Sequence, residues 1–246
     1  MIRWVYAFVD RPRALFEQAA AFWTAVTGTT LSERRGEDGE FATLLPPGAS
    51  GHDSCIKLQG VHDGPGGAHL DLAVADVPAL AQRAMDLGAR VELDEGDLVV
   101  LASPAGHRFC AVRWEGEARR PGIFQGTRLD QVCLDVAHDQ FDTAIAFWAQ
   151  LTDWPVRVGR HPEFGALRPP TPELPIRILL QRLDSPANPA AAHLDFACAN
   201  RFEARAAHER LGAAFVAEHE NWTVMRDPTG GRYCLTDRDP ETGSLR

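Results

Sequence analysis

The sequence contains almost no lysine: Lys57 is the only one among 25 basic residues. Acidic residues are more numerous, at 34. The formal net charge of −9 argues against nucleic acid and anionic membranes as general partners, because both require a basic surface. Long apolar runs are absent as well, and none approaches the roughly 20 residues of a membrane span. The apolar run at the N-terminus is too short for a signal peptide. We therefore expect a cytoplasmic protein.

Cysteine is also sparse, and its five copies are dispersed at positions 55, 110, 133, 198 and 234. No Cys-x-x-Cys pair occurs, so neither a disulfide framework nor a zinc knuckle is expected. The 246 residues are 45% hydrophobic and 24% charged, which is close to the globular average and argues against a disordered chain. This length fits two domains of about 120 residues.

The two halves of the chain repeat the same short motifs at nearly constant spacing. The segment Ala68-His69-Leu70-Asp71-Leu72 returns as Ala192-His193-Leu194-Asp195-Phe196, at an offset of 124. Further repeated motifs are Phe22-Trp23 with Phe147-Trp148, Pro46-Pro47 with Pro169-Pro170, Leu87-Gly88-Ala89 with Leu211-Gly212-Ala213, Pro104-Ala105-Gly106 with Pro228-Thr229-Gly230, and Cys110 with Cys234. The repeat predicts two tandem domains, at 1–115 and 127–240, with a linker near Glu115–Gly126.

Within each half, the apolar pattern predicts the order strand, helix and three strands, twice over. Residues 3–9 alternate like a strand, and Leu15, Phe22 and Val26 share one face of a helix at 14–26. The other expected helices are 78–87, 140–151 and 202–210, and the other expected strands are 29–34, 40–45, 54–60, 69–75, 89–93, 97–102, 107–114, 129–136, 155–159, 163–168, 176–183, 193–199, 213–217, 221–226 and 231–236. The predicted fold class is therefore α+β with four βαβββ units, which excludes coiled-coil, solenoid and doubly wound parallel folds.

Four βαβββ units in two pairs resemble the vicinal oxygen chelate superfamily, which includes glyoxalase I, extradiol dioxygenases and bleomycin-resistance proteins. The resemblance is carried by the strand Leu129–Val136, the helical pair Phe147-Trp148, the motif His193-Leu194-Asp195-Phe196 and the turn Asp227–Gly231. It implies two tandem glyoxalase-like domains, each with a cupped sheet. In this superfamily a divalent metal inside the cup chelates two neighbouring oxygens of a substrate. Antibiotic-sequestering relatives instead bind a small molecule without metal.

The resemblance also implies a set of metal-ligand positions in each half. In the C-terminal half these positions are Gln131, His193, Cys234 and a residue near Gln181. Because Cys234 stands where the family has glutamate, the carboxylates that Mg²⁺ or Mn²⁺ prefers are missing. No usual metal centre is therefore expected. The alternative is a divalent ion such as Zn²⁺ on Gln131, His193 and Cys234.

In the N-terminal half the corresponding positions are Trp4, His69, Cys110 and a residue near Lys57 or Gln59. Tryptophan cannot ligate a metal, so this half is expected to be the less competent one. One interpretation is that the N-terminal half has decayed and serves only as a scaffold for the other.

Each half also places an aspartate two residues after a strand histidine, which puts both side chains on one face of the strand. His193 with Asp195 is the candidate catalytic acid–base pair, because a neighbouring carboxylate fixes the imidazole tautomer or raises its pKa. The candidate ligand-binding residues are Gln131, Asp135, Gln181, Trp222, His69, Asp71 and Trp4. The alternative interpretation is structural: the histidines hydrogen-bond within the cup, and the cysteines and helical tryptophans are core residues.

The function that this resemblance implies is binding of a small molecule in a cupped-sheet cavity, without the usual metal centre. The alternative is a metal-dependent lyase, isomerase or dioxygenase with an atypical site at Gln131, His193 and Cys234. Whether the chain is an enzyme stays open at this point. The expected partner is a small-molecule ligand, and the chain is expected to be a monomer or a homodimer.

Overall fold

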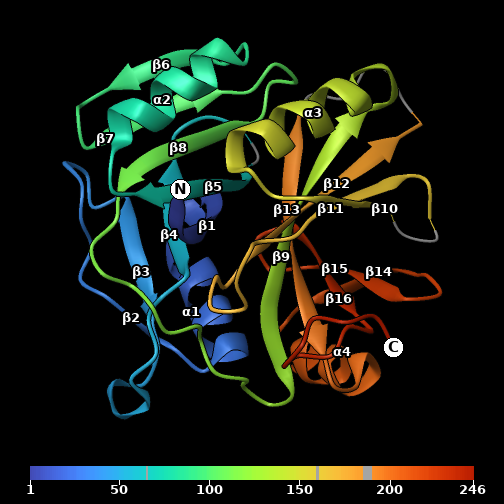
Figure 1. The fold of residues 1–246 in the computed structure, drawn as a ribbon. Helices are drawn as coiled ribbons and strands as arrows, with labels where there is room; N and C mark the ends of the chain where they lie inside the picture. The colour runs from blue at the N-terminus through green and yellow to red at the C-terminus, as the bar shows by residue number, and fades with distance from the viewer. Residues whose placement is uncertain (65, 159–160, 185–189) are drawn as a thin grey trace. The chain divides into compact units, whose positions relative to one another are not determined.

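The computed structural model describes residues 1–64, 66–158, 161–184 and 190–246, and Figure 1 labels its elements. The N-terminal half contains β1 (Ile2–Pro12), α1 (Phe16–Thr27), β2 (Thr30–Leu31), β3 (Phe41–Leu45), β4 (Ile56–Val61), β5 (Gly67–Val74), α2 (Val77–Asp86), β6 (Arg90–Asp94), β7 (Leu98–Ala102) and β8 (Arg108–Arg113). The C-terminal half contains β9 (Thr127–Ala137), α3 (Phe141–Thr152), β10 (Val156–Val158), β11 (Phe164–Leu167), β12 (Arg177–Leu183), β13 (Ala191–Cys198), α4 (Arg201–Arg210), β14 (Ala214–Glu218), β15 (Trp222–Arg226) and β16 (Arg232–Thr236). The predicted βαβββ order thus occurs four times.

The strands form two mixed eight-stranded sheets, one from each half. The strand orders are β2-β3-β4-β1-β5-β8-β7-β6 and β10-β11-β12-β9-β13-β16-β15-β14. The inner pairs β1–β4, β5–β8 and β13–β16 are parallel, whereas the outer strands follow one another as antiparallel hairpins. The predicted α+β class is confirmed. Among the described residues, none of the helices combines the length and apolar content needed to cross a membrane.

One predicted strand is much shorter than the sequence pattern suggested. The strand expected at 29–34 is reduced to β2, which covers only Thr30 and Leu31. The reason is local: Ser32 is followed by three charged residues and Gly36, so no apolar side chain continues the alternation of a strand. The helix expected at 14–26 begins slightly later, because a turn of 3₁₀-helix occupies Arg13–Leu15 before α1.

A glycine ends α1 and allows a close approach by a neighbouring segment. Gly28 adopts a left-handed conformation with φ of 65°, which side-chain-bearing residues rarely adopt. A Cβ atom at this position would lie 2.3 Å from the ring of Phe124. The sequence Thr27-Gly28-Thr29 at the end of α1 therefore both stops the helix and makes room for the segment that precedes β9.

The chain separates into two compact units, and each unit takes segments from both halves of the sequence. The first unit comprises Met1–Tyr6, His69–Ala118 and Val132–Ala192. The second comprises Ala7–Ala68, Arg119–Gln131 and His193–Arg246. The domain boundaries 1–115 and 127–240 stay a prediction from the repeat.

The core of the second unit is built around Trp23 from α1. Its ring stacks on Phe196 at a centroid distance of 5.9 Å and meets Tyr233 edge-on at 5.3 Å. The indole Nε1 donates a hydrogen bond to Asp227 Oδ2 at 3.2 Å. Trp23 is fully buried, as the helical pattern predicted.

The first unit contains the repeat counterpart, Trp148 from α3. It packs edge-on against Phe109 at a centroid distance of 5.0 Å and is also fully buried. Within the described chain its Nε1 has no hydrogen-bond partner. The reason lies in the sequence, since Ser103 replaces aspartate at the position that corresponds to Asp227.

This difference predicts that the same substitution lowers the free energy of unfolding by unequal amounts in the two halves. Trp23→Phe should lower the free energy of unfolding by about 1–3 kcal/mol more than Trp148→Phe, because only Trp23 loses a hydrogen bond to a buried carboxylate. Urea unfolding followed by circular dichroism measures both variants. Equal losses would show that the Asp227 hydrogen bond contributes nothing to stability.

Candidate functional site

Polar side chains gather on one face of the C-terminal sheet, at the strands β9, β13 and β16. His193 and Asp195 are two residues apart on β13 and therefore share a face. Asp195 lies directly opposite Cys234 in the parallel register of β13 and β16. Gln131 reaches the same face from β9, since its Nε2 donates a hydrogen bond to Asp195 Oδ2 at 2.7 Å. We call these four residues the C-terminal polar cluster.

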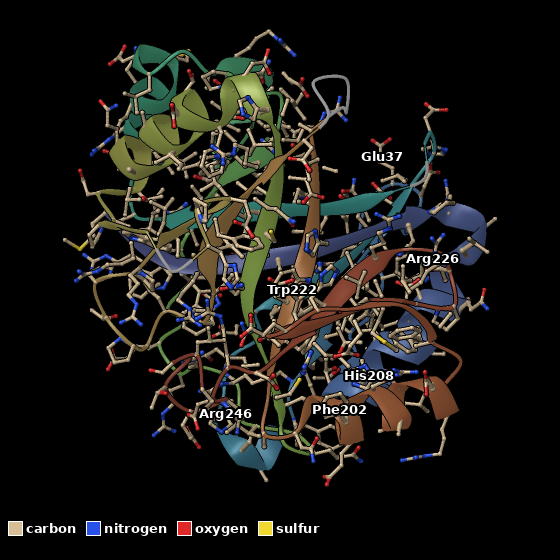
Figure 2. All side chains as sticks on the ribbon, turned by 90° about the vertical axis from the view of Figure 1, so that its right-hand side faces the viewer. Glu37, Phe202, His208, Trp222, Arg226 and Arg246 are labelled. Atoms are coloured by element: carbon tan, nitrogen blue, oxygen red, sulfur yellow. The ribbon has the colours of Figure 1, made fainter. Side chains whose placement is uncertain are left out.

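The centre of this cluster is a buried carboxylate. Asp195 is 4% exposed, and its Oδ1 lies 3.4 Å from His193 Nε2. Gln131 is equally enclosed at 3% exposure. The opposite face of the sheet belongs to the core, where Tyr233 contacts α4 through a 3.0 Å hydrogen bond between its hydroxyl and His208 Nδ1. Figure 2 labels His208 on α4 and Trp222 at the start of β15.

Burial sets the protonation chemistry of the cluster. It raises the pKa of Asp195 above that of an ordinary carboxyl, and this effect is opposed by His193, by hydrogen bonds from Gln131 and Cys234 and by the charge of Arg238. Burial together with the charge of Asp195 raises the pKa of the Cys234 thiol to about 11. Without a metal, Cys234 is therefore a neutral thiol and a poor nucleophile at neutral pH.

An aromatic side chain flanks the cluster on the same face. Strand β15 places Val224 opposite Cys234 and Trp222 opposite Thr236, so both side chains point to the side that carries Asp195. Trp222 is half-buried, and one face of its ring stacks on His219 at 4.4 Å and 11°. The predicted ligand-binding residues Gln131 and Trp222 are thus brought to one face.

The N-terminal half carries a matching cluster, but its first-strand residue differs from the one predicted. Strands β1 and β9 each have 11 residues and start at positions 2 and 127. Gln131 therefore corresponds to Tyr6, and Trp4 corresponds to Leu129. The assignment of Trp4 to the position of Gln131 was wrong, because the offset on the first strand is 125 residues. Trp4 itself is 1% exposed.

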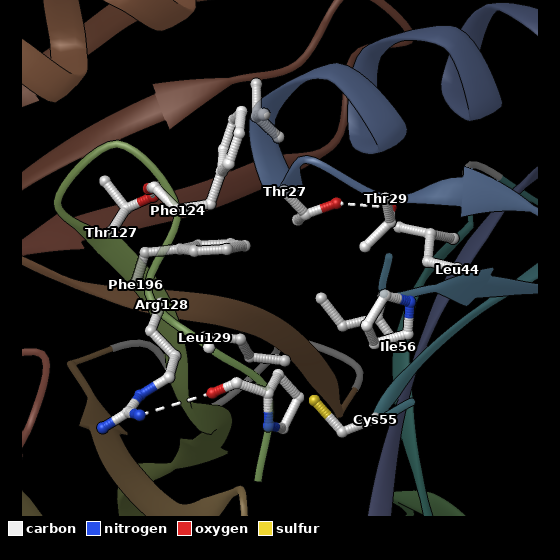
Figure 3. Close-up of a pocket in the computed structure, with 14 residues that line it drawn as sticks. Thr27, Thr29, Leu44, Cys55, Ile56, Phe124, Thr127, Arg128, Leu129 and Phe196 are labelled. Carbon is white, nitrogen blue, oxygen red and sulfur yellow. Dashed lines mark hydrogen bonds between the residues drawn. The ribbon is translucent and has the colours of Figure 1, made fainter. Parts of the chain in front are cut away.

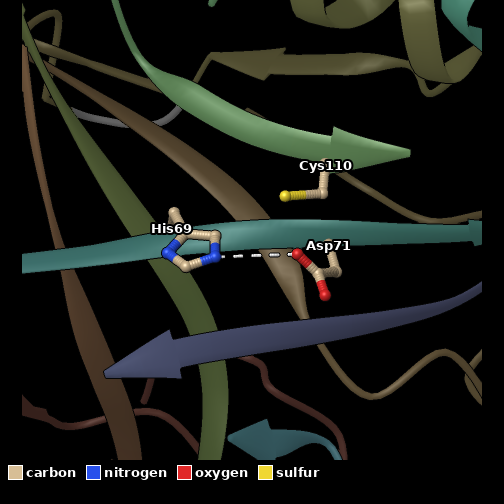
Figure 4. Close-up of side chains that lie close together, drawn as sticks. All are labelled: His69, Asp71 and Cys110. Atoms are coloured by element: carbon tan, nitrogen blue, oxygen red, sulfur yellow. Dashed lines mark ion pairs between the residues drawn. The ribbon is translucent and has the colours of Figure 1, made fainter. Parts of the chain in front are cut away.

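The other members of the N-terminal cluster lie where the repeat predicts. His69 Nε2 is 3.7 Å from Asp71 Oδ1 (Figure 4), and the two side chains are 13% and 5% exposed. Asp71 lies opposite Cys110 in the parallel register of β5 and β8. Tyr6 donates a hydrogen bond to Glu117 Oε1, a residue of the predicted linker.

Two further predicted residues, Asp135 and Gln181, belong to the first compact unit. Cys133 Sγ lies 3.9 Å from Gln181 Oε1, which joins β9 to β12. The backbone carbonyl of Asp135 accepts a hydrogen bond from His107 Nε2 at 3.0 Å. Burial lowers the pKa of His107, so this imidazole is neutral.

The donor atoms present do not match the usual metal centre of the superfamily. The ligand atoms of His193, Asp195 and Cys234 lie within 4.8 Å of one another. This set has one carboxylate, one imidazole and one sulfur, whereas Mg²⁺ and Mn²⁺ prefer several oxygens. Gln131 directs its amide nitrogen to Asp195, and the carboxylate of Asp195 lies among the clustered donor atoms. The set of Gln131, His193 and Cys234 stays a prediction.

Sequence reasoning missed three residues that act on these clusters. Arg238, just after β16, places a positive charge near Asp195. Tyr6 and Glu117 interact across 111 residues of sequence. Only the constant offset along β1 and β9 signals Tyr6, and no motif signals the other two.

None of the residues of the two clusters lines the small cavity that the structure contains among its described residues. It has a volume of about 40 Å³ and is lined mainly by apolar side chains, including Val26, Leu44, Ile56, Phe124, Leu129 and Phe196 (Figure 3). A cavity that holds a benzene ring has about 150 Å³. This one, beside α1 and β4, is therefore too small for an aromatic ring.

Several solved structures that are similar to this chain carry the names of enzymes. The chain is similar to a variant of homoprotocatechuate 2,3-dioxygenase from Brevibacterium fuscum, with a TM-score of 0.66 and 14% identity over 99% of this chain and 73% of that one. It is also similar to a mutant of 4-hydroxymandelate synthase from Streptomyces coelicolor, with a TM-score of 0.61 and 13% identity over 95% and 91%. Identities this low establish the fold alone.

A third similar structure is a xylose isomerase-like TIM barrel/4-hydroxyphenylpyruvate dioxygenase fusion protein, with a TM-score of 0.63 and 11% identity. The similarity covers 96% of this chain but only 48% of the fusion protein, so the chain spans about half of its length. No curated protein sequence matches the chain.

A family model for the glyoxalase-like domain matches the sequence twice, at residues 7–112 and 131–236. The two matches cover most of the chain and fall within the two halves that the repeat defines. The order βαβββ within each match agrees with the fold. The chain therefore belongs to the glyoxalase-like domain family of the vicinal oxygen chelate superfamily, with two tandem copies of the domain.

Proposed function

We propose that the chain binds a small polar molecule on the C-terminal polar cluster and that it does so without the superfamily's usual metal centre. The observation that carries this proposal is the buried Asp195 carboxylate, held by the amide of Gln131 at 2.7 Å and by the imidazole of His193 at 3.4 Å. A carboxylate fixed in this way accepts hydrogen bonds from a ligand's hydroxyl or amide groups without reorganising.

The ligand class follows from the neighbours of the carboxylate. Trp222 offers an aromatic surface on the same face of the sheet. A flat ring with adjacent hydroxyl groups satisfies both features, since the hydroxyls donate to Asp195 while the ring packs against the indole. The names of similar structures, among them a catechol dioxygenase, support this class. We therefore propose an aromatic hydroxy compound.

The cluster also contains the groups for proton transfer. His193 is close enough to Asp195 for the carboxylate to hold one imidazole tautomer, which leaves the other ring nitrogen to accept or donate a proton. In this arrangement His193 is the acid–base group and Asp195 orients it. The same two residues are thus the candidates for catalysis if the bound molecule is also converted.

The binding experiment uses catechol as the probe. Quenching of tryptophan fluorescence and isothermal titration calorimetry with the full chain should detect saturable binding, and Asp195→Asn should weaken it by about tenfold or more through the loss of a charged hydrogen-bond acceptor. Asp71→Asn, the repeat counterpart, is the matched control and should retain wild-type affinity. Saturable binding that is unchanged in Asp195→Asn, or binding of neither catechol nor related aromatic diols, would overturn the proposal.

A metal-dependent activity is the second candidate, favoured by the proximity of the donor atoms of His193, Asp195 and Cys234. Zn²⁺ accepts such a set. Two observations disfavour it: Gln131 donates a hydrogen bond to the Asp195 carboxylate, and the positive charge of Arg238 acts on the same carboxylate. Metal analysis of protein purified without an affinity tag separates the two candidate functions. A bound metal that is lost in His193→Ala would contradict the metal-free proposal and support the metal-dependent activity.

A further inference from the structure

The hairpin between β14 and β15 carries an aromatic stack beside the C-terminal polar cluster. Its turn is closed by the backbone N–H of His219, which donates to the carbonyl of Trp222 at 2.8 Å. The imidazole of His219 stacks on the indole of Trp222, with ring centroids 4.4 Å apart and an interplanar angle of 11°. The strand order β13-β16-β15-β14 places His219 on the outer side of Trp222 and Asp195 on the inner side. The face of the indole opposite His219 is therefore turned toward β16 and β13.

A buried arginine holds the turn that carries this stack. Arg201, the first residue of α4, is 6% exposed. Its Nη1 and Nη2 donate to the backbone carbonyls of His219 and Glu220, each at 2.9 Å. Its guanidinium also pairs with Glu218 Oε1 at 2.5 Å and with Asp237 Oδ2 at 2.9 Å. One side chain thus ties together the end of β14, the turn and the end of β16.

The position of Arg201 is unfavourable for α4 itself. A positive charge in the first turn of a helix faces the positive end of the helix dipole. The helix start is satisfied without the arginine, because the side chain of Asn200 accepts hydrogen bonds from the backbone N–H groups of Phe202 and Glu203. The two carboxylates and two carbonyls around the guanidinium offset its burial. The contacts of Arg201 therefore serve the hairpin and not the helix.

The N-terminal half does not repeat this arrangement, although its hairpin is the same. The residues at the repeat offset of 124 from Arg201, His219 and Trp222 are Val77, Glu95 and Leu98. The backbone N–H of Glu95 donates to the carbonyl of Leu98 at 2.9 Å, as in the other hairpin. The fold thus forms without the arginine and without the stack. Both features belong to the side of the chain that carries the proposed ligand site.

We propose that Arg201 and His219 hold the Trp222 indole as a fixed wall of the C-terminal polar cluster, and that this wall selects flat aromatic diols over saturated diols of the same size. Trp222 contacts the ligand, whereas Arg201 and His219 are positioning residues. A wall that is held before binding loses little conformational freedom when a ring packs on it. The inference rests on the proposed function, since it concerns the same site.

The test compares catechol with cis-1,2-cyclohexanediol by isothermal titration calorimetry on the full chain. Both ligands donate adjacent hydroxyls to Asp195, but only catechol has a flat ring. Trp222→Leu, which introduces the residue of the N-terminal hairpin, should weaken catechol binding by about three- to tenfold and change the affinity for the saturated diol by less than about twofold. His219→Ala and Arg201→Met should lower the preference for catechol by about twofold or more. Glu95→Ala, in the matched turn, is the control and should leave both affinities unchanged.

A spectroscopic measurement follows the wall without any ligand. The near-ultraviolet circular dichroism of wild type minus that of Trp222→Leu isolates the contribution of this indole. The same subtraction in an Arg201→Met background should give a smaller signal, because the turn is no longer held. An unchanged signal would show that Arg201 does not position Trp222. If Arg201→Met fails to fold, His219→Ala replaces it in both measurements, since His219 is exposed.

The outcomes separate this inference from the proposed function. If Asp195→Asn weakens both ligands but the variants of the wall leave the ratio of the two affinities unchanged, the inference is overturned and the proposed function stands. If only catechol binds to wild type, the comparison is between its affinities: a loss in Trp222→Leu and His219→Ala but not in Glu95→Ala supports the wall, and equal affinities overturn it. If neither ligand binds, both proposals are wrong.

Discussion

Replacing Asp227 with alanine should lower the free energy of unfolding by about 3–5 kcal/mol, the largest effect that we expect from a single substitution outside the aromatic core. The reason is a buried ion pair between β1 and the turn before β16. Arg11 Nη2 lies 2.6 Å from Asp227 Oδ2, and the two side chains are 3% and 0% exposed. Without Asp227, the guanidinium of Arg11 remains buried, and no other ion pair in the described part of the chain offers it a countercharge.

The same carboxylate also holds its own turn. Asp227 Oδ1 accepts hydrogen bonds from the backbone N–H groups of Thr229 at 2.8 Å and Gly231 at 3.0 Å. The aspartate of the Asp-Pro-Thr-Gly-Gly motif thus shapes the turn with one oxygen and binds Arg11 and Trp23 with the other. Asp227→Asn keeps the shape of the side chain and loses its charge. Its free energy of unfolding should therefore lie between those of wild type and Asp227→Ala.

Urea unfolding of the three proteins, followed by circular dichroism, provides the measurement. A surface pair is the control: Arg113 Nη1 lies 2.9 Å from Asp97 Oδ2, but these side chains are 67% and 72% exposed. Asp97→Ala should therefore cost no more than about 1 kcal/mol. If Asp227→Ala costs as little as Asp97→Ala, the buried pair does not stabilise the second unit as we infer.

The Arg11–Asp227 pair illustrates which parts of this protein the sequence reveals. The repeat of His69-Leu-Asp at His193-Leu-Asp identified the fold, because short apolar patterns and turn motifs are local and survive duplication. The partners Arg11 and Asp227 are 216 residues apart, and only Asp227 belongs to a visible motif. Long-range pairing of this kind depends on how strands and helices pack and leaves no local pattern.

The candidate sites show the same division. His69, Asp71 and Cys110, like their counterparts in the other half, were recognised from alternation along the strands. Tyr6 was missed because Trp4 was paired with Gln131 at an offset of 127, outside the 123 to 125 of the repeated motifs. A slip of two residues keeps the same strand face while changing the side chain. Charged neighbours such as Glu117 and Arg238 follow the last strand of each half and approach the sites only in the folded chain.

Acidification should destabilise the protein through a single buried histidine in α4. His208 is 3% exposed, and burial lowers its pKa to about 4, against an ordinary value of 6.5. Its neighbours are uncharged: Nδ1 hydrogen-bonds to the Tyr233 hydroxyl at 3.0 Å, and the ring meets Phe22 and Phe196 edge-on. No described side chain in this contact set compensates a positive charge on the imidazole.

The direction of the effect follows from the two pKa values. Between pH 6.5 and about pH 4 the unfolded chain binds a proton at His208 that the folded chain does not, so the free energy of unfolding decreases as the pH falls. A shift of this size corresponds to a loss of about 3 kcal/mol once the pH is below both values. Above pH 6.5 the imidazole is neutral in both states and contributes no pH dependence.

The measurement compares urea unfolding at pH 7 and pH 4.5 in wild type and in His208→Asn, whose amide retains a hydrogen bond to Tyr233. Other groups also titrate in this range, so the informative quantity is the difference in slope between the two proteins. His208→Asn should lose about 2 kcal/mol less than wild type between these pH values, because the buried group can no longer take up a proton. His138→Asn, at an exposed position just before α3, is the control and should retain the wild-type slope. Equal slopes in wild type and His208→Asn would show that acid destabilisation begins elsewhere, with His107, whose pKa burial also lowers, as the next candidate.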